Sequence, residues 1–420
     1  MKMKVGKHSI IEMHELVFHK ENEAEVVIGR TETNTFILLP AIGHETIELI
    51  QRGLTIGETE HNLYQKYIEP FDVSAFVEEL IEDHKLVYRL DGNIVNSRVQ
   101  IQEHFTWLHA KTGRFFFNPI SYFMYFAILL SAAGIVFLHP AYIPSYKDFL
   151  LTPSTPLNIT FSLAAAWFLL FLHEFAHLIS ARSLGVNCRI GLGHRLIFPV
   201  AETDMSGIVV VPRNQRYSAF IAGMCWDIVF LSAGVWLEWL HDLQMIVMNE
   251  NVLYTIRLIN CNLTALILFQ FLFFMKTDLY YVFTNYFRCP NLLEHTFLYF
   301  KCRFNSNPQL TEQWDEVSVM EKKIIYGFAW FYMVGGLVTV TIWILVQLPN
   351  LYRFISASIA QMSKMPLLSW SFAAGILLIG LCLLPSAVLT WSWIKSIRSR
   401  FMKNGLKGGE QIEKNYNQTR

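Results

Sequence analysis

Six long apolar stretches follow one another along the last three quarters of the chain, and each is free or nearly free of charged residues. About 20 consecutive apolar residues suffice to cross the hydrocarbon core of a bilayer as an α-helix. The pattern therefore predicts an α-helical polytopic membrane protein with about six transmembrane helices. The stretches are Phe115–Leu138, Phe149–Leu172, Tyr217–Leu237, Leu258–Met275 (with apolar character resuming at Leu279–Phe283), Ile324–Tyr352 and Met365–Ile394.

The first 110 residues have a different pattern, in which short strand-like runs and amphipathic helices alternate with turns. Val73, Val77 and Leu80 recur at helical spacing, and Asp91-Gly92 is a typical hairpin turn. Two strands, three helices and a hairpin predict a small α+β, winged-helix-like domain. The strands are Val26–Ile28 and Thr35–Leu39, the helices Ile42–Arg52, Gly57–Tyr67 and Asp72–His84, and the hairpin Leu86–Leu90 with Asn93–Val99.

Composition supports the membrane assignment, since 53% of the 420 residues are hydrophobic and 16% are charged, whereas soluble domains hold about 25% charged residues. The six cysteines form no C-x-x-C pair, so neither a disulfide framework nor a cysteine zinc site is indicated. No apolar core of signal-peptide length follows the first lysines, so we expect no secretory signal.

Charge is unevenly distributed, although the net charge of the whole chain is zero. Residues 1–100 hold 10 Lys and Arg against 17 Asp and Glu, a net charge of −7. Because phosphate attraction supplies most of the nonspecific affinity for DNA, we expect the N-terminal domain to bind a peptide and no nucleic acid. Lys and Arg gather before the first span, after the second, after the fourth and after the sixth. By the positive-inside rule, this predicts a multi-pass protein of the cell membrane with both termini in the cytoplasm.

The second apolar stretch runs into the motif His173-Glu174-Phe175-Ala176-His177. Residues i and i+4 share a face of a helix, so His173 and His177 can bind one Zn²⁺, with Glu174 beside them as general base. The alternative is that the motif matches by chance and that both histidines serve only in packing. It is weaker here because ionisable residues inside a membrane are costly and usually functional.

A catalytic zinc site usually has three protein ligands and one open position. Two acids in the apolar stretches are candidates for the third ligand, Asp227 and Asp278. Each could instead cap a helix or form an ion pair, for which Lys276 is a possible partner of Asp278. The residues by themselves do not choose between the two acids.

The motifs resemble those of the site-2 protease (M50) family of membrane zinc metallopeptidases. The similarity extends to its peptide zinc metalloprotease branch, which carries an N-terminal PqqD-like domain and occurs in epipeptide-type peptide clusters. The H-E-x-x-H motif is matched at His173, Glu174 and His177. The family's later K-T-D-G-Y-Y and P-N-L motifs are similar to residues 276–281 and Pro290-Asn291-Leu292. The resemblance implies that Asp278 is the third ligand of one Zn²⁺ per chain.

The resemblance also implies a division of the chain. Residues 1–110 would form the PqqD-like peptide-binding domain. Residues 111–300 would form the zinc-peptidase core, with a membrane-embedded hairpin after the zinc helix. Residues 301–420 would add two transmembrane helices and a basic cytoplasmic tail.

The chain departs from the family pattern beside Asp278. Leu279 stands where the family has Gly, and Gln270 and Phe273 stand where it usually has Asn and Pro. Gly and Pro would unwind the helix beside the metal, so Leu279 predicts a stiffer backbone. Asp204, Asn262 and Gln270 are candidate substrate-binding residues, although Asp204 could equally form a turn and Asn262 could bond between helices.

The sequence thus predicts an intramembrane zinc metalloprotease that hydrolyses a small, ribosomally made precursor peptide or a membrane-anchored substrate. Its expected partners are that peptide, membrane lipid and, as a further candidate, a peptide exporter. The alternative is a catalytically impaired membrane protein that acts in peptide export, immunity or regulation. A metal transporter is disfavoured, because no ligands recur along several helices and no loop is rich in His.

Overall fold

The computed structural model describes residues 5–364 with gaps at 22–24, 34, 69, 98–104, 106, 150–154, 196–197 and 305–306, and isolated positions from there to residue 394. The chain forms two compact units. The first consists of Met1–Tyr122, Phe175–Ile190 and Thr203–Ala222, and the second of the remainder. About half of the predicted span Met365–Ile394, and all of the basic tail after it, lie outside the described residues.

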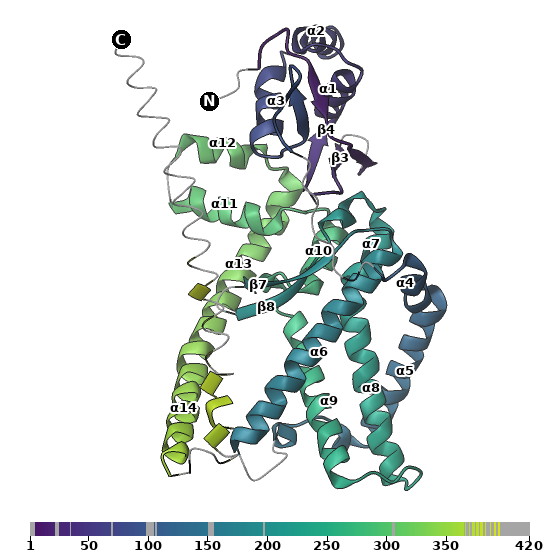
Figure 1. Ribbon diagram of the computed structural model, residues 1–420, viewed down its shortest axis with the longest axis vertical. Helices are drawn as coiled ribbons and strands as arrows, with labels where there is room; N and C mark the ends of the chain where they lie inside the picture. The colour runs from purple at the N-terminus through teal and green to yellow at the C-terminus, as the bar shows by residue number, and fades with distance from the viewer. Residues whose placement is uncertain are drawn as a thin grey trace. The chain divides into compact units, whose positions relative to one another are not determined.

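The N-terminal domain of the first unit contains three helices and two small antiparallel sheets (Figure 1). One sheet has the strand order β2-β3-β4 and the other β1-β5-β6. All three predicted helices are confirmed, whereas the short strands β1 and β2 were not predicted. The elements are β1 Ile11–Met13, β2 Val17–Lys20, β3 Glu25–Arg30, β4 Thr35–Pro40, α1 Ala41–Gln51, α2 Ile56–Tyr67, α3 Val73–Glu82, β5 Val87–Leu90 and β6 Asn93–Ile94.

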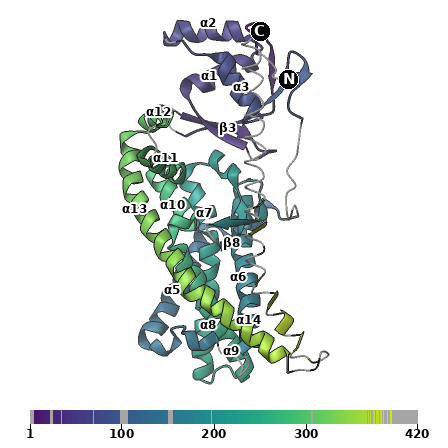
Figure 2. The same cartoon turned by 90° about the vertical axis from the view of Figure 1, so that its left-hand side faces the viewer.

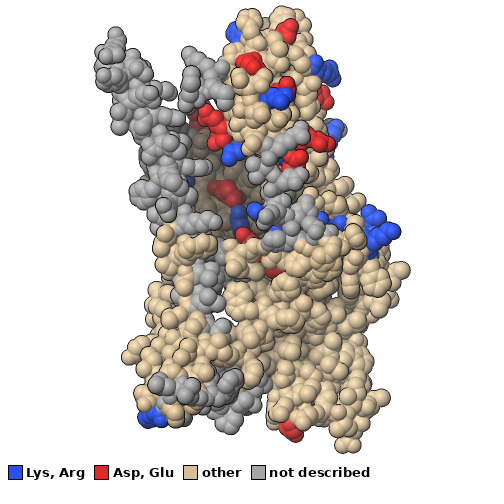
Figure 3. Space-filling model, in the orientation of Figure 1, with Lys and Arg blue, Asp and Glu red and all other residues tan. Residues whose placement is uncertain are grey.

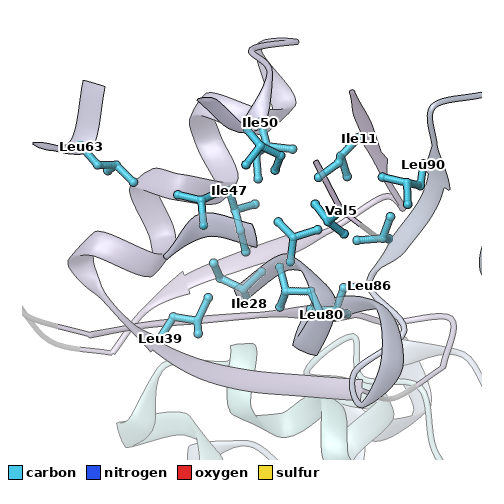
Figure 4. Close-up of a cluster of buried hydrophobic side chains, with 14 residues drawn as sticks. Val5, Ile11, Ile28, Leu39, Ile47, Ile50, Leu63, Leu80, Leu86 and Leu90 are labelled. Carbon is cyan, nitrogen blue, oxygen red and sulfur yellow. The ribbon is translucent and has the colours of Figure 1, made fainter. Parts of the chain in front are cut away.

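A continuous apolar core holds this domain together. Side chains from α1, α2, α3 and both sheets point toward one another, among them Ile28, Ile47, Leu63 and Leu80 (Figure 4). These four side chains are almost completely buried, as their positions on the apolar faces of their elements require.

The long helices carry the apolar stretches. Among the described residues, five helices are long and apolar enough to cross a membrane. They match five of the six predicted spans. The first combines α4 Ala110–Phe116 and α5 Pro119–Leu138, and the last runs through α13 Val319–Ile342, a π-helical turn η5 Trp343–Gln347 and α14 Leu348–Met362, as Figure 2 shows. The other three are α6 Thr155–Ser183, α8 Ala222–Asp242 and α9 Glu250–Gln270.

The surface of these helices is apolar where it meets the surroundings. Phe123, Phe137 and Leu337 are each more than two thirds exposed. On the face drawn in Figure 3, charged side chains gather over the N-terminal domain, and the long helices are almost bare of them. A bilayer is the solvent that such a surface fits.

Polar contacts join the helices of the second unit. Trp236 on α8 donates a hydrogen bond to Ser131 on α5 (3.0 Å). Asn262 on α9 lies 3.4 Å from Ser162 on α6. Side chains that hydrogen-bond across helices add to the close packing that drives association in a membrane.

Shorter elements connect the long helices. After α6 the chain forms the hairpin expected there, β7 Arg189–Arg195 with β8 Phe198–Asp204. A turn η3 Ser206–Val210 and helix α7 Arg213–Phe220 then lead into α8. After α9 the chain continues through the turn η4 Phe273–Met275 into α10 Asp278–Phe287. Two further helices, α11 Leu292–Phe304 and α12 Pro308–Glu316, precede α13, and the turns η1 Pro140–Tyr142 and η2 Tyr146–Phe149 precede α6.

Candidate metal centre

Helix α6 carries two histidines and a glutamate on buried turns near its C-terminal end. His173 and His177 are each 2% exposed and Glu174 is 7% exposed. The helix contains no Gly and ends at Ser183, two residues before Gly185, whose φ of 77° is a left-handed conformation that suits Gly. An unbroken helix fixes the spacing of the motif, so both imidazoles lie on one face.

The ring of His173 is held from α8. Its Nδ1 lies 2.6 Å from Oδ2 of Asp227, a carboxylate that is itself 1% exposed. When Nδ1–H donates to a carboxylate, the lone pair of the neutral imidazole is on Nε2. The contact therefore orients His173 with its Nε2 as the ligand atom.

The ring of His177 is held from α7. Its Nδ1 lies 2.7 Å from the carbonyl oxygen of Ala219. A carbonyl can only accept, so Nδ1 is the protonated nitrogen and Nε2 again carries the lone pair. The acceptors beside both Nδ1 atoms thus favour the tautomer that metal-binding imidazoles need.

Asp278 comes from the chain beyond α9. Its Oδ2 lies 3.0 Å from Nε2 of His173. Helix α9 ends at Gln270, Lys276 adopts a left-handed conformation (φ 56°), and Asp278 is the first residue of α10. Lys276 pairs with Glu294 (2.8 Å), so an ion pair with Lys276 does not explain the position of Asp278.

The interruption between α9 and α10 is fixed by hydrogen bonds to Gln270. Thr277 Oγ1 donates to the backbone carbonyl of Gln270 (2.7 Å). The backbone N–H of Asp278 donates to the side-chain oxygen of Gln270 (3.1 Å). The side-chain nitrogen of Gln270 lies 3.4 Å from Nε2 of His173. Leu279 itself lies within α10, and the chain is interrupted ahead of Asp278 instead of after it.

His173, His177 and Asp278 together could hold a metal ion. One ligand atom from each lies within 4.8 Å of the others, and all three residues are buried or largely buried. Two imidazole nitrogens and one carboxylate oxygen are ligands that Zn²⁺ accepts in catalytic sites. The donor set and the acceptors that hold both Nδ1 atoms fit such an ion.

Close approach of α8 to α6 depends on Gly223. A Cβ atom at this position would lie 2.5 Å from Cε1 and Nε2 of His173. No side chain larger than that of Gly fits against the imidazole without displacing it.

The other candidate residues lie in different surroundings. Gln270 is beside the metal ligands, as described above. Asn262 donates to the carbonyl of Leu258 (2.9 Å) and contacts Ser162 on α6, which is the interhelical role considered from the sequence. Asp204 pairs with Arg189 (3.1 Å) at the base of the hairpin and accepts a hydrogen bond from Ser206 Oγ (2.7 Å). The structure brings neither Asn262 nor Asp204 into the group of metal ligands.

Three contributors to the site were missed by sequence reasoning. They are the carboxylate of Asp227 in the role of a histidine partner, the carbonyl of Ala219, and the space left by Gly223. Asp227 gave a signal as an acid within an apolar stretch. A backbone carbonyl and a missing side chain give none.

No protein-family model matches the chain, and no curated protein and no solved structure is significantly similar to it.

Proposed function

We propose that this protein is a membrane zinc metallopeptidase of the site-2 protease type that hydrolyses a peptide bond in a small precursor peptide or a membrane-anchored substrate. The observation that carries the proposal is the group His173, His177 and Asp278, with ligand atoms within 4.8 Å and Glu174 next to it on α6. The five apolar helices support the membrane location.

Each side chain has a defined role in this proposal. His173, His177 and Asp278 would hold the zinc ion, which would supply Lewis acidity to an attacking water and to the scissile carbonyl. Glu174 accepts the proton of that water and passes it to the leaving amine. The side-chain amide of Gln270, beside His173, can donate a hydrogen bond to the carbonyl oxygen as negative charge develops there.

The catalytically impaired alternative drew its support from Leu279. The interruption between Gln270 and Asp278 weighs against it, since the helix already breaks beside the ligand without a Gly after the Asp. The acceptors beside Nδ1 of both histidines direct Nε2 toward the ligand group, which favours metal binding over a role in packing alone.

The setting of the reaction follows from the resemblance and the loop charges. We place both termini in the cytoplasm of a multi-pass protein in the cell membrane, with a sixth span at 365–394. The winged-helix-like N-terminal domain takes the part of a PqqD-like peptide-binding domain, and a peptide exporter is a further candidate partner.

Replacing the general base tests the proposal. Glu174→Gln should retain zinc but lower peptide cleavage by ~10²–10⁴-fold, because the proton acceptor is lost and the ligands are not. Zinc content would be measured by plasma emission spectrometry, and cleavage by mass spectrometry on peptides encoded by small genes beside its own. Glu250→Gln, at the exposed start of α9, is the matched control. Cleavage by Glu174→Gln at the rate of the parent would overturn the mechanism, and a parent without zinc would overturn the function.

A further inference from the structure

A buried arginine on α7 binds a carboxylate of the N-terminal domain. Arg216 is 8% exposed, and its Nη1 and Nη2 lie 3.3 and 2.5 Å from the two carboxylate oxygens of Glu21, the residue after β2. The same guanidinium donates to the carbonyls of Val211 (2.7 Å) and Val209 (2.8 Å). Arg213 adds a second contact to Glu21 at 3.4 Å. One carboxylate therefore engages two arginines of a single short helix.

Bidentate, largely buried pairs of this kind are geometrically strict. Two parallel charge-assisted hydrogen bonds fix the plane of the guanidinium, and removing one partner leaves a buried charge without compensation. The turn η3, just before α7, also packs against β2, β3 and β4. Helix α7 is thus attached to the N-terminal sheet on one side.

The other side of α7 is attached to the zinc helix. The Ala219 carbonyl binds Nδ1 of His177, and the hydroxyl of Ser218 contacts that of Ser180 on α6 (3.0 Å). Arg216 and Ala219 are three residues apart within one helix of eight residues. A displacement of Arg216 therefore moves the carbonyl that orients His177.

We propose that Glu21 is a positioning residue for the metal centre. Through Arg216 and α7 it fixes the Ala219 carbonyl, and with it the tautomer and direction of the His177 ring. The coupling rests on the metal binding in the proposed function but does not require peptidase activity. The coupling is reciprocal by linkage. A ligand that binds the N-terminal domain and disturbs Glu21 would lower the affinity for metal, and metal would lower the affinity for that ligand by the same factor.

The test uses the full-length protein in detergent with Zn²⁺ and Co²⁺ as probes. Loss of a hydrogen-bond partner of a ligating histidine typically costs 10–100-fold in metal affinity, and Glu21 acts one step further away. We expect Glu21→Gln to raise the zinc Kd by about 10-fold and to change the visible absorption of the Co²⁺ form. Arg216→Lys should raise the zinc Kd and change the spectrum in the same way. The Kd of the double variant should not exceed that of either single variant, because both substitutions break the same Glu21–Arg216 contact.

Glu12→Gln is the matched control. Glu12 lies in the same domain and pairs with Arg89 within it (3.2 Å), so its loss should leave the zinc Kd and the Co²⁺ spectrum unchanged. A Glu21→Gln protein that remains folded with the parent's Kd and spectrum would overturn the coupling, as would additive effects in the double variant. A parent that binds zinc but cleaves no peptide would sink the proposed function while leaving this coupling measurable.

Discussion

Asp227 governs how firmly His173 can hold a metal ion. Its carboxylate accepts from Nδ1 at 2.6 Å, and such outer partners of metal-bound histidines typically contribute 10–100-fold to affinity. We therefore predict that Asp227→Asn raises the zinc Kd by about 10–100-fold, because an amide can donate to Nδ1 and stabilise the wrong tautomer. Competition with a chromophoric chelator would measure the change.

Asp278→Asn provides the comparison within the same site. Asp278 is a member of the ligand group and Asp227 is not, so the zinc Kd should rise more for Asp278→Asn than for Asp227→Asn. The opposite order would make Asp227 the ligand and would contradict the assignment of the third ligand.

Gly223 sets the distance between α8 and the imidazole of His173. We predict that Gly223→Ala lowers both zinc occupancy and thermal stability, because its Cβ would lie 2.5 Å from Nε2 and Cε1 of the ring and overpacking costs about 1–3 kcal/mol. Gly134→Ala on α5 should change neither, because no described residue beyond the adjoining turns of its own helix has an atom within 4 Å of the added Cβ. Zinc content and the detergent-solubilised Tm are the measurements, and equal behaviour of the two variants would refute the steric argument.

At the residue scale, the sequence reveals those metal ligands whose spacing is set within a single helix. His173 and His177 are predictable because α6 alone sets their separation. The partners of their rings come from α7 and α8, so they depend on packing that no local pattern encodes. The resemblance already favours Asp278 over Asp227 as the third ligand, whereas the contact of Asp227 with His173 needed the observed structure.

At the element scale, the break between α9 and α10 is produced by tertiary packing and not by a local sequence signal. Nothing between Gln270 and Asp278 is Gly or Pro, so local propensity predicts a continuous helix. Phe273 instead stacks on Phe331 of α13, with ring centroids 4.2 Å apart, and Thr277 caps the Gln270 carbonyl. These tertiary contacts stabilise the interruption that gives Asp278 its position.

A buried ion pair joins α8 and α9 away from the metal ligands. Glu238 is 4% exposed and accepts from Arg257 Nε (3.0 Å) and Asn260 (2.9 Å). We predict that Arg257→Met lowers the free energy of unfolding by about 3 kcal/mol, the low end for a broken buried pair, because the Arg257 side chain is 35% exposed. Thermal unfolding in detergent would show this as a lower Tm.

The double variant Glu238→Gln with Arg257→Met separates the pair from its surroundings. Gln can still accept from Asn260 and carries no charge, so much of the lost stability should return. If the double variant is as unstable as the sum of the single variants, the two side chains act independently and the buried pair is not what joins the helices.

At the scale of the whole molecule, the long apolar runs predict the long helices. Five of the predicted spans coincide with helices of membrane length, because a bilayer demands uninterrupted apolar runs that are visible in any sequence. Short strands such as β1, with three residues, carry too little pattern to be found. They form because their partners β5 and β3 offer backbone hydrogen bonds.

The acidic N-terminal domain is the part of the molecule expected to select the substrate. Its net charge of −7 over residues 1–100 suits a basic or neutral peptide, which could add a strand to an edge of one of its sheets. Tethered binding raises the local substrate concentration to roughly mM for a short linker. We predict that deleting residues 1–100 raises KM for a full-length precursor but spares the KM of a leaderless peptide.

The deletion also removes Glu21, so its effect on the metal centre must be separated from its effect on peptide capture. Glu21→Gln supplies that control, because it disturbs the contact with Arg216 and leaves the rest of the domain in place. With rates expressed per bound zinc, Glu21→Gln should affect both peptides equally, and only the deletion should act selectively on the precursor. Equal losses for both peptides in the deletion variant, or no heat of binding between the precursor and the parent protein by calorimetry, would show that the domain does not capture the substrate.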